Sequence, residues 1–265
     1  MTRWPNQQTA VVTGASSGIG RAIAIALADA GVDSLLIHYR NNEAGAEETA
    51  EMVRERDCEA STFAADLRKA EDRERLVATA FERLGELTVW VNNAGADVLT
   101  GEAGKWVFEE KLRVLMDVDV IGTILLSRLV VARLLEQEAS PSPSIIFNGW
   151  DQAPEGMDGE AGQMFGPVKA AVMSYARSLA HSVAPLIRVN TVAPGWIRTA
   201  WGEDVSDYWN ERAKAESLMN RWGHPDDVAK AVVYLADPNN TFVTGETINV
   251  NGGWDRTLRE PPPRG

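Results

Sequence analysis

Thr13-Gly14-Ala15-Ser16-Ser17-Gly18-Ile19-Gly20 is the stretch of sequence that decides the fold. It follows an apolar run over residues 9–13, which is typical of a buried strand. It precedes a helical repeat of apolar residues that Gly31 ends. Glycines between a strand and a helix let the backbone approach a pyrophosphate, and the helix then points its first N–H groups at the phosphate charge. The strand–loop–helix context therefore predicts a phosphate-binding loop.

Outward from this loop, short β-branched runs alternate with longer helical patterns along the whole chain. Strands are expected over residues 9–13, 34–39, 60–64, 87–91, 144–147, 187–192 and 247–250. Helices are expected from residue 19 to Gly31 and over residues 43–56, 71–84, 115–138, 168–183 and 226–235. This alternation predicts an α/β protein: a single-domain, doubly wound Rossmann fold with a mostly parallel seven-stranded sheet and helices on both faces.

The chain shows no interdomain linker and no internal repeat. We expect one domain over residues 1–256 and a Pro-rich mobile tail over residues 257–265. Residues 1–8 lack the apolar core of a signal peptide, and the most apolar stretch, residues 118–135, is interrupted by Arg128 and Arg133. These features predict a cytoplasmic protein that does not enter a membrane.

The charge and the metal-binding residue types limit the partners of the protein. The formal net charge is −12, so phosphates of a nucleic acid or of an anionic membrane would be repelled. Cys58 is the single cysteine, and the three histidines are widely spaced. Neither an intrachain disulfide nor a metal site is expected, and a small molecule is the expected ligand.

Four further motifs match the spacing of one known family. The glycine loop reads Gly-x3-Gly-x-Gly, and Asn92-Asn93-Ala94-Gly95 follows the fourth expected strand. Asp66 and Leu67 follow the third strand, Pro194-Gly195-Trp196-Ile197-Arg198-Thr199 follows the sixth, and Asn251-Gly252-Gly253 follows the last. From about residue 7 to residue 254 the chain resembles the short-chain dehydrogenase/reductases, and among them the ketoacyl-reductase-like and glucose-dehydrogenase-like branch.

The resemblance implies a bound nicotinamide dinucleotide. The residues that would hold it are Gly14, Ser16, Ser17, Gly18, Ile19, Gly20, Arg40, Asn41, Asp66, Leu67, Asn93, Ala94, Gly95, Lys169, Pro194, Gly195, Ile197 and Thr199.

The end of the second strand predicts which dinucleotide binds. An acidic residue there would accept hydrogen bonds from a ribose 2′-hydroxyl and repel a 2′-phosphate, but this chain has Arg40. The planar guanidinium of Arg40 can pair with a 2′-phosphate, which favours NADP(H) over NAD(H). The alternative is that Arg40 is an ordinary surface arginine.

The residues that would carry the family's chemistry are largely replaced. The family donates a proton from a tyrosine four residues before a lysine, with help from a serine and an asparagine. Here Lys169 is present, but Phe165 stands at the tyrosine position, Trp150 near the serine position and Asp119 at the asparagine position. Residues 145–173 contain no Ser, Thr or Tyr, so no shift of alignment restores a hydroxyl. Loss of a general acid typically costs about 10²–10⁴-fold in rate.

Three candidate catalytic residues remain, and each also has a non-functional interpretation. Lys169 would still hold the nicotinamide ribose, or it persists on its helix by chance. Asp119 would be the counter-ion of Lys169, or it caps a solvated stretch. Asp151 would be a replacement acid if burial raised its pKa, or it is a solvated loop carboxylate.

The chain contains nine tryptophans, and four of them lie between the sixth and the last expected strand: Trp196, Trp201, Trp209 and Trp222. With Trp150 and Phe165 they predict a pocket of aromatic faces for a flat or apolar ligand. Packing of a lid or a contact between subunits would explain the same residues.

Three functions are consistent with these observations. The first is an NADP(H)-dependent oxidoreductase that takes its proton from water, from Asp151 or from the substrate. The second is a lyase or isomerase without net hydride transfer. The third is a non-catalytic NADP(H)-binding protein, for example a partner subunit in a hetero-oligomer. A homo-dimer or homo-tetramer is expected from the apolar faces of the long helix and of the helix that carries Lys169.

Overall fold

The structure is a computed structural model that describes residues 4, 7–137, 141–199 and 205–253. Its seven strands lie side by side in the order β3-β2-β1-β4-β5-β6-β7, and every neighbouring pair is parallel. The strands are β1 (Thr9–Val12), β2 (Ser34–Tyr39), β3 (Glu59–Ala64), β4 (Val89–Asn92), β5 (Ser144–Asn148), β6 (Arg188–Pro194) and β7 (Thr247–Val250). The predicted α/β Rossmann fold is confirmed.

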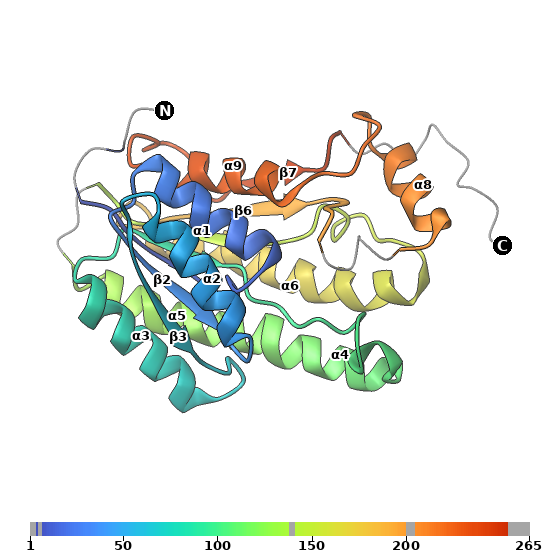
Figure 1. Ribbon diagram of the computed structural model, residues 1–265, viewed down its shortest axis with the longest axis horizontal. Helices are drawn as coiled ribbons and strands as arrows, with labels where there is room; N and C mark the ends of the chain where they lie inside the picture. Colours follow the sequence, from blue (N-terminus) through green and yellow to red (C-terminus); the bar gives the residue numbers. More distant parts are fainter. Residues whose placement is uncertain (1–3, 5–6, 138–140, 200–204, 254–265) are drawn as a thin grey trace.

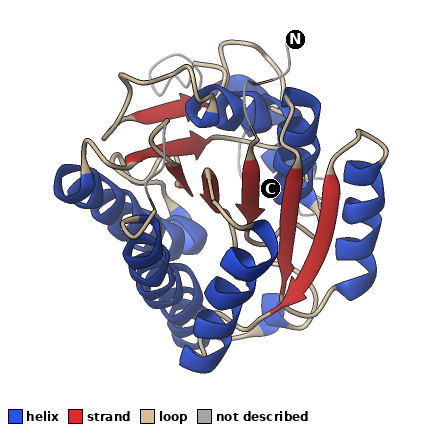
Figure 2. Ribbon diagram, turned by 90° about the vertical axis from the view of Figure 1, so that its left-hand side faces the viewer, coloured by secondary structure: helices blue, strands red, loops and turns tan. Residues whose placement is uncertain are grey.

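Helices cover both faces of the sheet (Figures 1 and 2). One buried cluster joins the sheet to α1 (Gly18–Ala30), α2 (Glu43–Arg54) and α9 (Pro225–Ala236). The other joins it to α3 (Ala70–Leu84), α5 (Thr123–Leu134) and α6 (Gly159–Val183). β1 contributes Val12 to the first cluster and Val11 to the second, because successive side chains of a strand point to opposite faces.

The strand order reverses next to β1, whose neighbours are β2 and β4. In an open parallel sheet such a reversal leaves a crevice at the carboxyl ends of the strands, and ligands bind there. The glycine loop joins β1 to α1 at this crevice, so the fold places the predicted phosphate loop at the predicted binding edge.

The long helix differs from its predicted course over residues 115–138. It begins earlier, as α4 (Phe108–Leu115), and passes through a π-helical segment, Met116–Gly122, before α5. π-Helical turns occur mostly as short interruptions at functional sites, and this one contains Asp119. Residue 138 lies outside the described residues.

Two further elements were mispredicted. α6 was expected from residue 168 but begins at Gly159, because buried packing of Met164 and of the Gly162 backbone outweighs the low helix propensity of Gly166 and Pro167. α8 (Asp207–Glu216) was not predicted, because its sequence is too polar to show an apolar repeat. The tail, residues 257–265, lies outside the described residues. Among the described helices, none combines the length and the apolar character that crossing a membrane would require.

Candidate active site

The glycine loop is held so closely that side chains would not fit. Gly14 has φ +64°, and a Cβ there would lie 2.7 Å from the Cα of Ala94. A Cβ on Gly20 would lie 2.9 Å from the Cα of Ala15 and closer still to the Gly14 carbonyl oxygen. Asn93 fixes the loop from β4, because its Nδ2 donates to the carbonyl oxygens of Thr13 (3.0 Å) and Gly14 (3.1 Å). The amino terminus of α1 therefore faces the crevice with exposed backbone N–H groups, as a pyrophosphate requires.

A cleft of about 860 Å³ opens above this loop. Its lining includes these predicted cofactor residues: Gly14, Ser16, Ser17, Gly18, Ile19, Gly20, Arg40, Asn41, Asp66, Leu67, Asn93, Ala94, Gly95, Lys169 and Thr199. The other three, Pro194, Gly195 and Ile197, line an adjoining cavity. The predicted residues thus line two adjoining cavities at the carboxyl ends of the strands.

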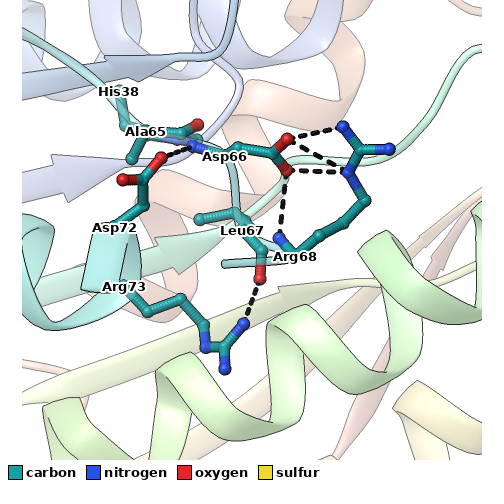
Figure 3. A network of polar contacts seen from close by, with 7 residues as sticks. All are labelled: His38, Ala65, Asp66, Leu67, Arg68, Asp72 and Arg73. Carbon is teal, nitrogen blue, oxygen red and sulfur yellow. Dashed lines mark hydrogen bonds and ion pairs between the residues drawn. The ribbon is translucent and has the colours of Figure 1, made fainter. Parts of the chain in front are cut away.

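A network of charged groups shapes the end of the cleft at β3 (Figure 3). The guanidinium of Arg68 donates two hydrogen bonds to the carboxylate of Asp66, with its Nε at 2.9 Å from Oδ1 and its Nη2 at 2.5 Å from Oδ2. These bonds lower the pKa of Asp66 to about 2. Asp72 accepts from the Asp66 backbone N–H (2.8 Å), and Arg73 donates to the Leu67 carbonyl (2.6 Å). Asp66 and Leu67 are therefore fixed in place before any ligand binds.

His38 on β2 supports the glycine loop, a role that sequence reasoning missed. Its Nδ1 accepts from the Gly14 N–H at 3.2 Å, and its Nε2 lies 3.1 Å from the Ala65 carbonyl oxygen, to which it donates. Both bonds together require the neutral ring. Burial lowers the pKa of His38 to about 4. The sequence did contain one signal for this role, a histidine at the end of a strand that was expected to be buried. Burial without a charged partner favours the neutral form of the ring.

We expect His38 to make the protein less stable in mild acid. As the pH falls below 6.5, His38 becomes protonated in the unfolded chain, but in the folded protein it stays neutral until about pH 4. Stability is therefore lost on going from pH 6.5 to pH 4, by about 3 kcal/mol in all. Asp151 acts in the opposite sense, because its raised folded pKa favours the folded protein as the pH falls through about 6.

The contribution of His38 is obtained by comparing wild type with His38→Gln in how the free energy of unfolding changes with pH. Urea unfolding at pH 7 and pH 5 should show a drop in wild type that is smaller by about 2 kcal/mol in His38→Gln. His181→Gln, at an exposed histidine, is the control and should retain the wild-type drop. An equal drop in wild type and His38→Gln would contradict this account.

The second cavity, of about 460 Å³, is lined mainly by apolar and aromatic side chains. Trp150, Phe165, Trp196 and Trp209 contribute to its wall. It shares with the nucleotide cleft Ile19, Leu99, Asn148, Phe165, Lys169 and Thr199. Trp150 and Phe165 therefore line an open space beside the cleft and do not fill it.

Lys169 lies at the junction of the two cavities and is paired with Asp119. Its Nζ is 3.0 Å from Asp119 Oδ2, and the side chains are 15% and 2% exposed. The other carboxylate oxygen of Asp119 accepts from the Ala96 N–H at 2.8 Å. The structure thus matches the counter-ion reading of Asp119, whereas Phe165, one helical turn before Lys169, has no group that can donate a proton.

Asp151 is buried, so the reading of a solvated loop carboxylate is wrong. It is 5% exposed, its Oδ2 accepts from Asn251 Nδ2 at 3.0 Å, and its Oδ1 has no hydrogen-bond partner among the described residues. Burial raises its pKa to about 6. It lies next to Gly195 but is not among the residues that line either cavity, so it has no direct contact with their contents.

Three tryptophans in the described part of the last third of the chain, Trp196, Trp209 and Trp222, form one cluster. The ring centroid of Trp196 lies 5.8 Å from that of Trp209 and 5.9 Å from that of Trp222. Trp209 faces the cavity, whereas Trp222 is buried behind it. Trp201 lies outside the described residues. The cluster thus lines the cavity through Trp196 and Trp209 and packs internally through Trp222, whereas a contact between subunits stays a prediction.

Arg212 on α8 connects the tryptophan cluster to the start of α6. Its guanidinium lies 2.7 Å from Asp158, which precedes α6, and 2.7 Å from Glu216. Glu216 also accepts from Trp196 Nε1 at 2.8 Å. Sequence reasoning missed this contact, because α8, which carries Arg212 and Glu216, was not predicted and Asp158 lies 54 positions before Arg212.

The fold, the glycine cradle and the crevice define a Rossmann-type protein with a ligand cavity next to its nucleotide cleft. The family described as enoyl-(acyl carrier protein) reductase matches residues 14–255. An uncharacterized oxidoreductase of Mycobacterium tuberculosis is 35% identical over 94% of this chain and 92% of its own length. The chain belongs to the short-chain dehydrogenase/reductase family, as its motifs predicted.

Two solved structures show the same fold. One is the 3-oxoacyl-[acyl-carrier protein] reductase of Brucella melitensis in complex with NAD, with a TM-score of 0.83 and 28% identity over 94% of this chain and 97% of that one. The other is a short-chain dehydrogenase of Burkholderia cenocepacia in complex with NADP, with a TM-score of 0.81 and 26% identity over 93% and 97%. Relatives with this fold therefore bind one or the other of the two dinucleotides.

Proposed function

We propose that the protein is an NADP(H)-dependent oxidoreductase for a flat, aromatic small molecule. The observation that carries this proposal is the shared wall between the nucleotide cleft and the aromatic cavity, at Phe165, Lys169, Asn148 and Thr199. A ligand in the cavity would lie directly beside the end of a dinucleotide in the cleft. When bound, the nicotinamide would supply or accept a hydride there.

The residues divide into groups along the cleft. Ser16, Ser17 and the first N–H groups of α1 would hold the pyrophosphate, and Asp66 with Leu67 would contact the adenine. Lys169, locked by Asp119, would hold the nicotinamide ribose. Pro194, Gly195, Ile197 and Thr199 would hold the nicotinamide amide. Asp151 is set aside as a proton donor, because it does not line the cavity.

We expect Arg40 to select NADPH. It is exposed at the end of β2 and lines the cleft, and a neighbouring acid, Asp66, is paired with Arg68. Calorimetric titration should give low-micromolar binding of NADPH and weaker binding of NADH. Arg40→Ala should weaken NADPH binding about 10–100-fold, the value of a charge-assisted phosphate contact, and leave NADH unchanged.

Arg75→Ala is the control, because Arg75 is exposed on α3 and does not line the cleft. Equal binding of NADPH and NADH by wild type would reject the preference for NADP(H). Absence of binding of either would reject the proposed function as a whole.

A non-catalytic NADP(H)-binding protein is the second candidate, alone or as a partner subunit. It is favoured by the same residue that weakens the first, Phe165, which leaves no phenol beside Lys169. Tight NADPH binding without NADPH oxidation by any carbonyl, alkene or imine would favour it. In either case we propose self-association through the long helix, where Ile121 (47%) and Leu125 (40%) are exposed.

A further inference from the structure

The aromatic cavity offers little acidity to a bound ligand. Among the described residues that line it, the transferable protons belong to the Lys169 ammonium and the Thr199 hydroxyl. Loss of a proton from the ammonium would leave the buried carboxylate of Asp119 without its partner charge, and an aliphatic hydroxyl is a far weaker acid than a phenol. Reduction of a neutral carbonyl creates an alkoxide that must be protonated, so this wall is poorly suited to it.

The charges around the cavity favour a cation. Lys169 is the one charged side chain among the described lining residues, and Asp119 neutralises it at 3.0 Å. Behind the wall, the single positive charge of Arg212 is shared by two carboxylates, Asp158 and Glu216. A positively charged ligand would therefore meet no unmatched positive charge of the protein.

The aromatic rings favour a cation for a separate reason. Trp150, Phe165, Trp196 and Trp209 line the cavity, and the face of an aromatic ring attracts positive charge. One cation–π contact is already present in the protein, because the guanidinium carbon of Arg212 lies 5.3 Å from the centre of the Trp209 ring. A flat cation would gain both stacking area and cation–π attraction.

We propose that the substrate is a flat iminium ion, a compound with a C=N⁺ bond conjugated to an aromatic ring. This inference rests on the proposed function and names its substrate class. The iminium carbon receives a hydride with its two electrons and forms the new C–H bond. The C=N π pair moves onto nitrogen, whose formal charge falls from +1 to 0, while the reduced nicotinamide dinucleotide is oxidised. No proton is needed in the step, so the missing tyrosine costs nothing.

The same change of charge would help the product to leave. The product is a neutral amine in the cavity and loses the cation–π attraction that held the substrate. It takes up a proton from water after release. Asp119 is a positioning residue in this scheme, since it fixes Lys169 and cancels its charge.

The inference is tested first by binding, without turnover. The protein, with no dinucleotide added, is titrated by calorimetry with an N-methyl-dihydroisoquinolinium salt and with its neutral carbon isostere, a methyl-dihydronaphthalene. We expect the cation to bind at least about tenfold more tightly. In Asp119→Asn, the amide still accepts from Ala96, but Lys169 is left unpaired. There the affinity for the cation should fall about tenfold and that for the isostere should stay the same.

The second test is reduction, followed by NADPH absorbance. Wild type should reduce the iminium with no solvent deuterium isotope effect and should leave α-tetralone unchanged. Phe165→Tyr should then gain measurable reduction of α-tetralone, because it restores a phenol one turn before Lys169.

The outcomes separate the two proposals. Reduction of α-tetralone by wild type, or equal affinity for the cation and its isostere, would overturn the iminium inference and leave the oxidoreductase standing. Failure to bind NADPH, or cation binding with no reduction of any substrate, would overturn the proposed function and the inference with it.

Discussion

Gly20→Ala should reduce the affinity for NADPH by at least about 100-fold, because the added methyl group has no room. Its Cβ would lie 2.5 Å from Asn93 Nδ2, which holds the loop to β4, and in contact with the Gly14 carbonyl. The Gly14 carbonyl belongs to the phosphate loop and Asn93 holds that loop in place, so the loop must move away from the position that aims its N–H groups at a pyrophosphate. Titration with NADPH measures the effect, and circular dichroism shows whether the fold remains.

Gly101→Ala is the matched control. Gly101 has φ +56°, and no atom lies within 4 Å of a Cβ built there. That substitution carries backbone strain without a steric clash, and it should leave NADPH affinity within about twofold of wild type. If Gly20→Ala binds NADPH as wild type does, the glycine loop is not the phosphate site.

Lys169→Met should lower the free energy of unfolding by about 3 kcal/mol, because it leaves the carboxylate of Asp119 buried without its partner. Asp119 is 2% exposed and would retain one hydrogen bond, from the Ala96 N–H. Adding Asp119→Asn to Lys169→Met removes the buried charge and should recover most of the loss. Urea unfolding of both single variants and the double variant gives the coupling energy.

An exposed ion pair provides the control for this measurement. Lys105 and Glu102 are 2.7 Å apart, with side chains 73% and 86% exposed. Lys105→Met should therefore cost less than about 1 kcal/mol. Equal effects of Lys169→Met and Lys105→Met would show that the Asp119–Lys169 pair is not a buried structural pair, and the charge balance inferred for the aromatic cavity would fail.

The sequence alone was sufficient for the sheet and for the glycine loop. These features depend on local patterns: the apolar runs that form buried strands and the glycine spacing between β1 and α1. The altered catalytic positions stay a prediction, which depends on the absence of a hydroxyl over residues 145–173. The predicted cofactor residues could also be named, because they follow the carboxyl ends of parallel strands, which meet at one edge of a sheet. Helix limits were predicted poorly where glycine and proline precede a packed helix, as in α6.

Only the tertiary structure decided which groups are charged, paired or buried. Asp119 and Lys169 are far apart in the sequence, but they pair because the π-helical segment that carries Asp119 packs beside α6. Asp151 is desolvated behind Gly195, His38 is held neutral between Gly14 and Ala65, and Arg212 joins α8 to the start of α6. Periodicity reports which face of an element is apolar, but desolvation and ion pairing depend on atoms brought together from distant segments, and these set the chemistry of the site.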